Sequence, residues 1–241
     1  PPAHPRTVRK RMSRAGETIR LESRADGFAF DAYHVKPGDA RRGGLVLIQE
    51  IFGVTDHIRE VADDFAEDGY EVIAPAFFDR QQRGFEASYD PDDMARAAAL
   101  SQAALWDQVT GDAQAAIDAL QGPVFAAGFC WGGAASGAVA ARCEGVAAAS
   151  CFYGRRISEL LDEPPRCPTI LHFGKIDASI PLERVEEIRD RYPDMPVHMY
   201  DAGHGFASDR RKDYQPDAAH LARLRTLQLF ARSGGGRGEG A

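Results

Sequence analysis

The sequence predicts an α/β fold, with a mostly parallel central sheet, helices on both faces and an antiparallel hairpin at the N-terminus. Short apolar runs alternate with segments of helical spacing, which is the pattern of strand–helix–strand units. The run at 44–48 is continuously apolar, as in a strand that is covered on both faces, and residues 169–173 are read as another buried strand. Residues 17–24 and 28–35 instead alternate apolar and polar residues across an Asp-Gly turn, and this pattern indicates a hairpin.

The remaining elements follow in order after the hairpin. Residues 56–68 have apolar side chains at helical spacing, and Gly69 is suited to end that helix. The helix expected at 92–120 is interrupted near 110–112, and residues 77–91 form a polar, irregular connection that is suited to border an active site. The other expected strands are 70–74, 123–127, 145–152 and 197–200, and the other expected helices are 182–191 and 217–231.

Composition indicates one globular enzyme domain at 15–232, between a basic segment at 1–14 and a flexible, glycine-rich tail at 233–241. Apolar residues make up 44% of the chain and charged residues 27%, and the net charge of −7 argues against nucleic-acid binding. No apolar run approaches the roughly 18 residues of a membrane span, and 1–14 lacks the apolar core of a signal peptide. Four cysteines are too few for a disulfide scaffold, so we expect a cytoplasmic protein.

Residues 128–133, Gly-Phe-Cys-Trp-Gly-Gly, are the most informative segment of the chain. An apolar run precedes them and a small-residue run follows at 134–140, which predicts a strand, a tight turn and a helix with Cys130 at the apex. Unpaired N–H groups and the positive end of the helix dipole favour a thiolate at such a position. Alone, the motif fits a buried cysteine at a glycine-rich helix start equally well, so the rest of the chain decides.

Two later residues complete a catalytic set. Asp177 follows the strand 169–173, and His204 lies in a glycine-bracketed loop beyond the strand 197–200. Each residue alone has an ordinary explanation in a turn or loop, but the carboxyl ends of parallel strands meet at one edge of a sheet. The chain order of nucleophile, acid and histidine is that of α/β-hydrolases, so we expect that fold and a triad of Cys130, His204 and Asp177.

This triad predicts a mechanism of acyl transfer. The thiolate of Cys130 attacks an ester carbonyl to form an acyl-enzyme, and His204 then activates water for deacylation. Asp177 holds the imidazole in the correct tautomer. The backbone N–H groups of Trp131, which follows the nucleophile, and of Ile51 are the expected oxyanion hole.

The chain resembles the dienelactone hydrolase family of α/β-hydrolases. The resemblance rests on Gln-Glu-Ile-Phe-Gly at 49–53, on 128–133, on Asp177 and on Gly-His-Gly-Phe at 203–206, and it extends over nearly the whole chain. Ordinary serine esterases carry a His-Gly-Gly loop in place of 49–53. In the family, a glutamate close to the nucleophile takes part in switching its thiol between resting and activated states. Glu50 matches that position, so the resemblance adds it to the catalytic residues.

The resemblance is partial at the substrate-binding positions. Family members that hydrolyse dienelactone hold the ring carboxylate with one arginine in the loop after the fourth strand and another shortly after the catalytic histidine. Arg80 matches the first position, whereas Ser208 stands at the second, with Arg210 and Arg211 just beyond it. Tyr153 ends a strand on the same side as the nucleophile and is either a pocket residue or an aromatic at the edge of the core. We therefore expect Arg80, Tyr153 and Ser208 to border the substrate.

The expected function is cysteine-dependent hydrolysis of esters or lactones, and the resemblance implies a dienelactone hydrolase, or carboxymethylenebutenolidase, of aromatic compound catabolism. The sequence has no phosphate-binding loop, no dinucleotide fingerprint and no histidines at ligand spacing, so we expect neither a cofactor nor a metal. The partner is then a small-molecule ester or lactone rather than a nucleic acid or a membrane, and the protein a monomer or small homo-oligomer.

Three alternatives stay open at this point. One is a broad carboxylesterase or lactonase that acts on neutral esters. Another is a non-catalytic binding protein with the same fold. The third is a redox-sensing thiol at Cys130, which lacks an adjacent resolving cysteine. Neither of the last two explains why Asp177 and His204 follow in triad order.

Overall fold

Eight strands form one sheet in the computed structural model, which describes residues 16–38 and 40–236. The strands are β1 (Glu17–Glu22), β2 (Ala29–Val35), β3 (Gly43–Ile48), β4 (Tyr70–Pro75), β5 (Val124–Phe129), β6 (Val146–Phe152), β7 (Thr169–Gly174) and β8 (Val197–Tyr200). The helices are α1 (Asp56–Glu67), α2 (Pro91–Ala103), α3 (Trp106–Ala119), α4 (Trp131–Arg142), α5 (Leu182–Arg191) and α6 (Pro216–Arg232), with a short 3-10 helix, η1, at Arg155–Leu160. The expected basic segment 1–14 and residues 237–241 of the expected tail lie outside the described residues.

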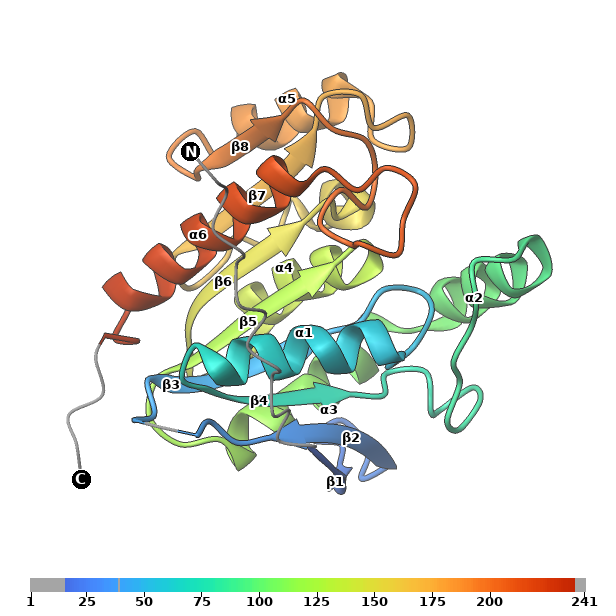
Figure 1. Ribbon diagram of the computed structural model, residues 1–241, viewed down its shortest axis with the longest axis vertical. Helices are drawn as coiled ribbons and strands as arrows, with labels where there is room; N and C mark the ends of the chain where they lie inside the picture. The colour runs from blue at the N-terminus through green and yellow to red at the C-terminus, as the bar shows by residue number, and fades with distance from the viewer. Residues whose placement is uncertain (1–15, 39, 237–241) are drawn as a thin grey trace, which may run out of the picture.

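The sheet order is β1-β2-β4-β3-β5-β6-β7-β8. β2 pairs antiparallel with both β1 and β4, whereas every other pair of neighbouring strands is parallel. The predicted N-terminal hairpin and mostly parallel sheet are therefore confirmed. Because the parallel strands run in the same direction, the segments that follow β3, β5, β6, β7 and β8 meet at one edge of the sheet, to which the arrowheads point in Figure 1.

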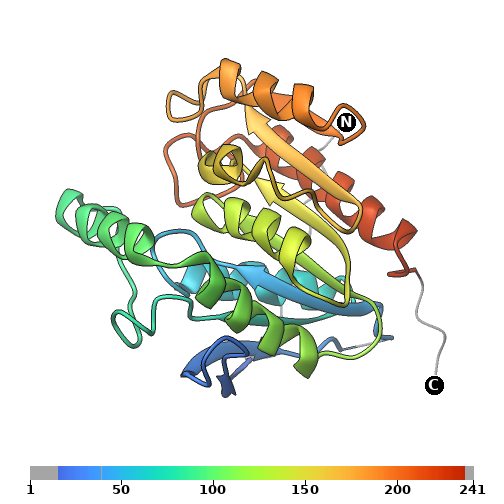
Figure 2. The same ribbon diagram turned by 180° about the vertical axis from the view of Figure 1, so that it is seen from behind.

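Helices cover both faces of the sheet. α1 and α6 lie on the face seen in Figure 1, and α3, α4 and α5 lie on the face seen in Figure 2. The pleat of β3 explains how one strand serves both layers, because successive side chains point to opposite faces. Leu45 and Leu47 join one apolar cluster with residues of α1 and α6, while Val46 and Ile48 join the other with residues of α3 and α4.

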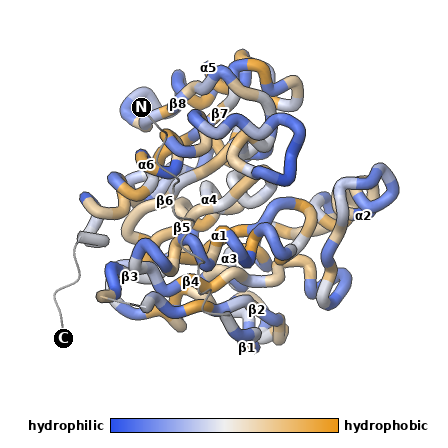
Figure 3. The backbone as a smooth tube through the Cα atoms, viewed as in Figure 1, coloured by the Kyte–Doolittle hydropathy of each residue, from blue (hydrophilic) through white to orange (hydrophobic). Residues whose placement is uncertain are grey.

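Hydropathy follows this layering. Hydrophobic stretches gather in the central strands, and the outer turns are mostly hydrophilic (Figure 3). Every residue of β3 and β7 is buried, and the two strands are accordingly apolar except for the buried Thr169 and His172 of β7. Within residues 16–38 and 40–236, no helix is both long enough and apolar enough to cross a membrane.

The helical segment between β4 and β5 differs from the expectation of a single helix interrupted near Gly111. It consists of α2 and α3, which are separated at 104–105. Gly111 lies inside α3, where an added Cβ would come within 2.5 Å of the side chain of Ala25 in the turn between β1 and β2. The glycine thus permits close packing instead of ending the helix. The actual break lets Trp106 begin α3 with its ring stacked on Trp131.

Candidate active site

Cys130 occupies a strained turn between β5 and α4. Its backbone has a φ of 56° and a ψ of −116°, a conformation that non-glycine residues rarely adopt. The Cys130 N–H donates to the carbonyl of Phe152 at the end of β6, with an N–O distance of 3.0 Å. This turn has the geometry of a nucleophile elbow, with the side chain held at the carboxyl edge of the sheet.

Two glycines make the turn possible through close approach of backbone to backbone. An added Cβ on Gly128 would lie 2.1 Å from the carbonyl oxygen of Gly132. An added Cβ on Gly132 would lie 2.4 Å from the carbonyl oxygens of Ile48 and Gln49, so any larger residue would push α4 away from the end of β3.

The structure brings Cys130, His204 and Asp177 into hydrogen-bonding contact. His204 Nε2 lies 3.1 Å from Cys130 Sγ, and His204 Nδ1 lies 2.7 Å from Asp177 Oδ2. Asp177 follows β7 and His204 follows β8, so neighbouring parallel strands deliver both side chains to the same edge. The distances are those expected between a nucleophile, its base and the group that orients the base.

Ser179 is part of this arrangement and was not expected from the sequence. Its N–H and its hydroxyl both donate to Asp177 Oδ1, at 2.8 and 2.6 Å, and its Oγ also lies 3.0 Å from His204 Nδ1. The signal in the sequence was a serine two residues after the aspartate, a spacing at which side chains and backbone bond locally. Asp177 therefore uses one oxygen for Ser179 and the other for His204.

Charge on the acid and the base is set by these contacts. Burial of His204 opposes its charge, but the hydrogen bonds to Asp177 and Cys130 outweigh burial and raise its pKa to about 10. Burial of Asp177 likewise opposes its charge, yet the hydrogen bonds from His204 and Ser179 lower its pKa below the usual 3.8. At neutral pH the site thus favours a carboxylate and an imidazolium beside the thiol.

Glu50 lies just past the end of β3 and is buried, with 2% of its surface exposed. Its Oε1 has no hydrogen-bond partner among the described residues, and the nearest cation to it is Arg211, with Nη1 at 3.9 Å. Burial raises the pKa of Glu50, and the positive charges of Arg211, His57 and His204 counter only part of this effect. A carboxyl group in this position is therefore easier to protonate than one at the surface.

A cavity of about 530 Å³ opens over Cys130, and both expected oxyanion residues line it. Trp131 is the first residue of α4, so its N–H has no partner within the helix. Ile51 stands in the loop after β3, which the close approach of Gly132 holds against the elbow. The remaining walls come from α2, η1 and the loops after β7 and β8, and α2 projects beyond the sheet in Figures 1 and 2.

The cavity over Cys130 is distinguished by the side chains that line it and not by its volume. A second cavity of about 540 Å³ lies where β7 and β8 begin, at the opposite edge of the sheet, and is lined by proline-rich loops and Cys167. Neither Cys130 nor His204 lines it. In the part of the chain that the structure describes, no group of three or more His, Cys, Asp or Glu side chains is placed to hold a metal ion.

Tyr153 and Ser208 do not line the cavity over Cys130. Tyr153 is fully buried, has a φ of 38°, and places its ring centroid 5.2 Å from that of His204 in an edge-on contact. Tyr153 therefore packs against the ring of His204. Ser208 is also buried, with 1% of its surface exposed, and its Oγ has no partner among the described residues. Neither side chain is placed to contact substrate in the cavity.

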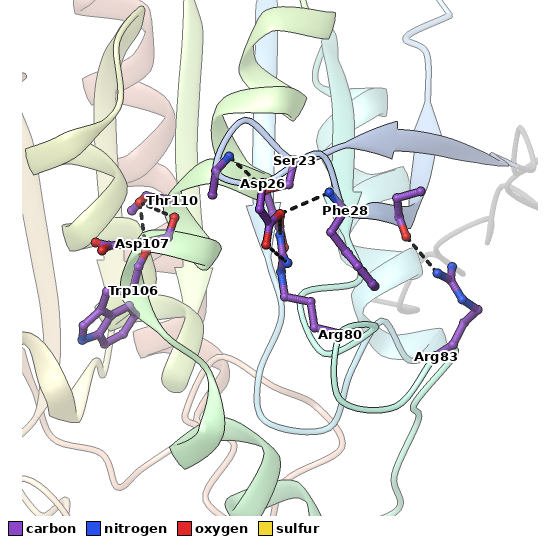
Figure 4. A network of polar contacts seen from close by, with 11 residues as sticks. Ser23, Asp26, Phe28, Arg80, Arg83, Trp106, Asp107 and Thr110 are labelled. Atoms are coloured by element: carbon purple, nitrogen blue, oxygen red, sulfur yellow. Dashed lines mark hydrogen bonds and ion pairs between the residues drawn. The ribbon is translucent and has the colours of Figure 1, made fainter.

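Arg80 is turned away from the cavity and is bound by two carboxylates. Its guanidinium donates to Asp112 at 2.6 and 3.2 Å and to Asp26 at 2.7 and 3.0 Å, and it lies over the ring of Phe28 (Figure 4). The expectation that Arg80 holds a substrate carboxylate is therefore not supported by its position. The physical reason is that a buried carboxylate, Asp112 with 1% of its side chain exposed, needs this cation as its partner.

The two arginines after Ser208 have different surroundings. Arg210 donates to Glu60 of α1 and does not line the cavity. Arg211 does line it, with its guanidinium near Glu50 and 5.6 Å from the ring centroids of Phe52 and Tyr89. The cavity also contains Arg155 of η1, which was not expected from the sequence because η1 itself was not.

The chain is similar to known proteins over most of its length. The family model of the dienelactone hydrolase family matches residues 30–234. A carboxymethylenebutenolidase from Pseudomonas putida is 33% identical over 230 residues, which are 89% of this chain and 96% of the relative. A Synechocystis protein named as a candidate carboxymethylenebutenolidase is 34% identical over 208 residues, 77% of this chain and 84% of its own. A solved structure from Klebsiella pneumoniae, a candidate dienelactone hydrolase, has a TM-score of 0.76 at 27% identity and covers 90% of this chain and 99% of its own.

Proposed function

The chain belongs to the dienelactone hydrolase family, a family of hydrolases, and we propose that it cleaves ester or lactone bonds through an acyl-enzyme on Cys130. The observation that carries this proposal is the continuous line of contacts from Cys130 Sγ through His204 to Asp177, with lengths of 3.1 and 2.7 Å. A thiol needs such a base to act as a nucleophile near neutral pH.

Acylation begins with the thiolate of Cys130 and the imidazolium of His204. The sulfur attacks the ester carbonyl, and the N–H groups of Ile51 and Trp131 stabilise the resulting oxyanion. His204 then donates its Nε2 proton to the leaving alkoxide, so that the C–O bond breaks and a thioester remains. Asp177 holds Nδ1–H throughout, which keeps Nε2 directed at the sulfur.

Deacylation uses the same groups in reverse. Neutral His204 accepts a proton from water at Nε2, and the hydroxide attacks the thioester carbonyl in the same oxyanion hole. Cys130 leaves as the thiolate, and the carboxylic acid product departs. Asp177 stays ionised throughout, because its contacts with His204 and Ser179 favour the carboxylate.

Glu50 acts on the charge state of the nucleophile in this proposal. Its buried carboxyl group has a raised pKa, so its negative charge is costly and the protonated form is favoured more than at the surface. Arg211, at 3.9 Å, is the cation that stabilises the ionised form. A substrate that drew Arg211 away would leave the ionised form of Glu50 without this cation.

A broader carboxylesterase or lactonase for neutral esters is the second candidate. It is favoured by one observation, the engagement of Arg80 by Asp26 and Asp112 outside the cavity. Apolar side chains also line part of the cavity, including Met94 and Ile176, and suit an uncharged acyl or alcohol group.

A burst experiment tests covalent catalysis. 4-Nitrophenyl acetate should release one equivalent of nitrophenolate rapidly, and intact-protein mass spectrometry should find a single acetyl group on Cys130. Cys130→Ala should lose at least about a thousandfold in kcat/KM, because removal of a triad nucleophile costs several orders of magnitude. Cys167→Ala is the matched control, since this partly exposed cysteine lies outside the site. Hydrolysis retained by Cys130→Ala would refute the proposal.

A further inference from the structure

The cavity over Cys130 is rich in cations, although the chain as a whole is acidic with a net charge of −7. Cationic side chains reach it from two sides: Arg155 and Arg156 from η1, and Arg211 and Lys212 from the loop after β8. The acidic side chains that line it are Asp177 and Asp213, and Asp177 is already bound by His204 and Ser179. The surroundings of the nucleophile therefore favour an anion.

Arg155 differs from the other cavity arginines because its charge has no partner. Its side chain is exposed and makes no hydrogen bond or ion pair with any residue that the structure describes. Arg211 instead faces Glu50, and Arg156 donates to Glu159. An arginine that lines a reactive cavity with all of its N–H donors free is suited to bind a carboxylate.

Arg156, the next residue of η1, makes contacts that position this short helix. Its Nε donates to Glu159 at 2.8 Å, and its guanidinium carbon lies 4.7 Å from the ring centroid of Trp106. Trp106 in turn stacks on Trp131, the residue after the nucleophile, with an interplanar angle of 12°. Arg155 therefore belongs to a short helix that is packed against the elbow through the rings of Trp106 and Trp131.

We propose that Arg155 is the anion-binding residue of this active site, in the role that Arg80 and Ser208 do not fill, and that it holds the carboxylate of an anionic ester or lactone. This inference rests on the proposed function, because it names the substrate class of the same cavity. The carboxylate binds at η1, after β6, while the reacting carbonyl lies at Cys130.

Matched ester pairs measure this preference. The first pair is mono-4-nitrophenyl adipate and its methyl-capped diester, which differ by one charge on the acyl side. The second is 4-acetoxybenzoate and its methyl ester, which differ by one charge on the alcohol side. The readout is the ratio of kcat/KM for the anionic ester to that for its neutral partner, so that a general loss of activity cancels.

Arg155→Gln should lower this ratio about five- to tenfold for at least one pair, mainly through KM, because a partly exposed charge-assisted contact is lost. Arg155→Lys should retain most of the preference, and Arg155→Glu should reverse it. Arg232→Gln is the matched control: this arginine ends α6, away from the cavity, and its substitution removes the same charge. An Arg155→Gln ratio equal to that of the control for both pairs would overturn the proposal.

A binding measurement separates this inference from the proposed function. In the Cys130→Ala background, titration calorimetry with 4-acetoxybenzoate measures the anion site without hydrolysis. Adding Arg155→Gln should weaken that binding by a similar factor and leave the affinity for the methyl ester within about twofold. Equal binding of 4-acetoxybenzoate with and without Arg155 would overturn the subsite even if Cys130 proves to be the nucleophile.

Discussion

Replacement of Asp177 by asparagine isolates the group that sets the charge of the histidine. Asp177 Oδ2 accepts from His204 Nδ1 at 2.7 Å, while Oδ1 accepts twice from Ser179. Asparagine has nearly the same shape but no negative charge. The substitution therefore tests electrostatics at the triad with little change in packing.

The magnitude follows from the pKa of His204, which is raised from 6.5 to about 10. Because each tenfold change in a protonation equilibrium corresponds to about 1.4 kcal/mol, this difference favours the imidazolium by roughly 5 kcal/mol. Asp177 and Cys130 share that stabilisation, and a hydrogen bond to a charged partner contributes about 1.5–3 kcal/mol. We therefore expect Asp177→Asn to lower the pKa of His204 to between about 8 and 9.

The assay is the pH dependence of kcat/KM for a neutral 4-nitrophenyl ester, with Cys130→Ala as the blank. Acylation needs the imidazolium, so activity falls as pH rises through the pKa of His204. In the unsubstituted protein the upper limb should lie near pH 10, and in Asp177→Asn it should move to lower pH. The maximum should also fall by about a hundredfold or more, because asparagine permits the wrong tautomer.

The sign of the linked change in stability gives an independent check. A folded-state pKa above the unfolded value of 6.5 adds stability that is complete below pH 6.5 and is lost as pH rises through about 10. Urea midpoints should therefore decline from pH 7 to pH 10 more steeply in the unsubstituted protein than in Asp177→Asn. An unchanged upper limb, together with equal pH dependence of the midpoints, would refute the assigned role of Asp177.

Three further predictions concern packing and buried charge. Gly132→Ala should lower both the melting temperature and kcat/KM, because its Cβ would lie 2.4 Å from two backbone oxygens at the end of β3. Gly137→Ala is the control and should be tolerated, since the nearest neighbour of its Cβ would lie at 3.7 Å. Equal melting temperatures of the two variants would count against this packing argument. Glu50→Gln should raise the urea midpoint at pH 8, because burial makes the ionised form of Glu50 costly in the folded protein. This gain should shrink as pH falls toward 4.5. A lower midpoint of the variant at pH 8 would mean that the attraction of Glu50 to nearby cations outweighs the cost of its burial. Arg80→Ala should lower the free energy of unfolding by about 3 kcal/mol, because it leaves the buried carboxylate of Asp112 without its cation. The preference for anionic esters should not change. A selective rise in KM for those esters would instead mean that Arg80 contacts the substrate.

Local patterns in the sequence were enough to predict the fold and the three side chains, of Cys130, His204 and Asp177, that the structure brings into contact. Continuous apolar runs predicted parallel strands, and the glycines around Cys130 predicted a tight turn that only such residues permit. Asp177 and His204 each follow a predicted strand, and parallel strands bring their carboxyl ends together whatever the details of packing. Glu50 was singled out by the family resemblance at 49–53 instead, and it lies just past the end of β3.

Only the tertiary structure decided which charged side chains reach the cavity. Arg80 contacts Asp26, 54 residues away in the chain, and Asp112, 32 residues away, so no local pattern could show that its guanidinium is already occupied. A long flexible side chain has many rotamers, and its position depends on whichever carboxylates the fold brings within reach. The same reason left Arg155 unnoticed, since its free guanidinium matters only because η1 and the elbow are packed together.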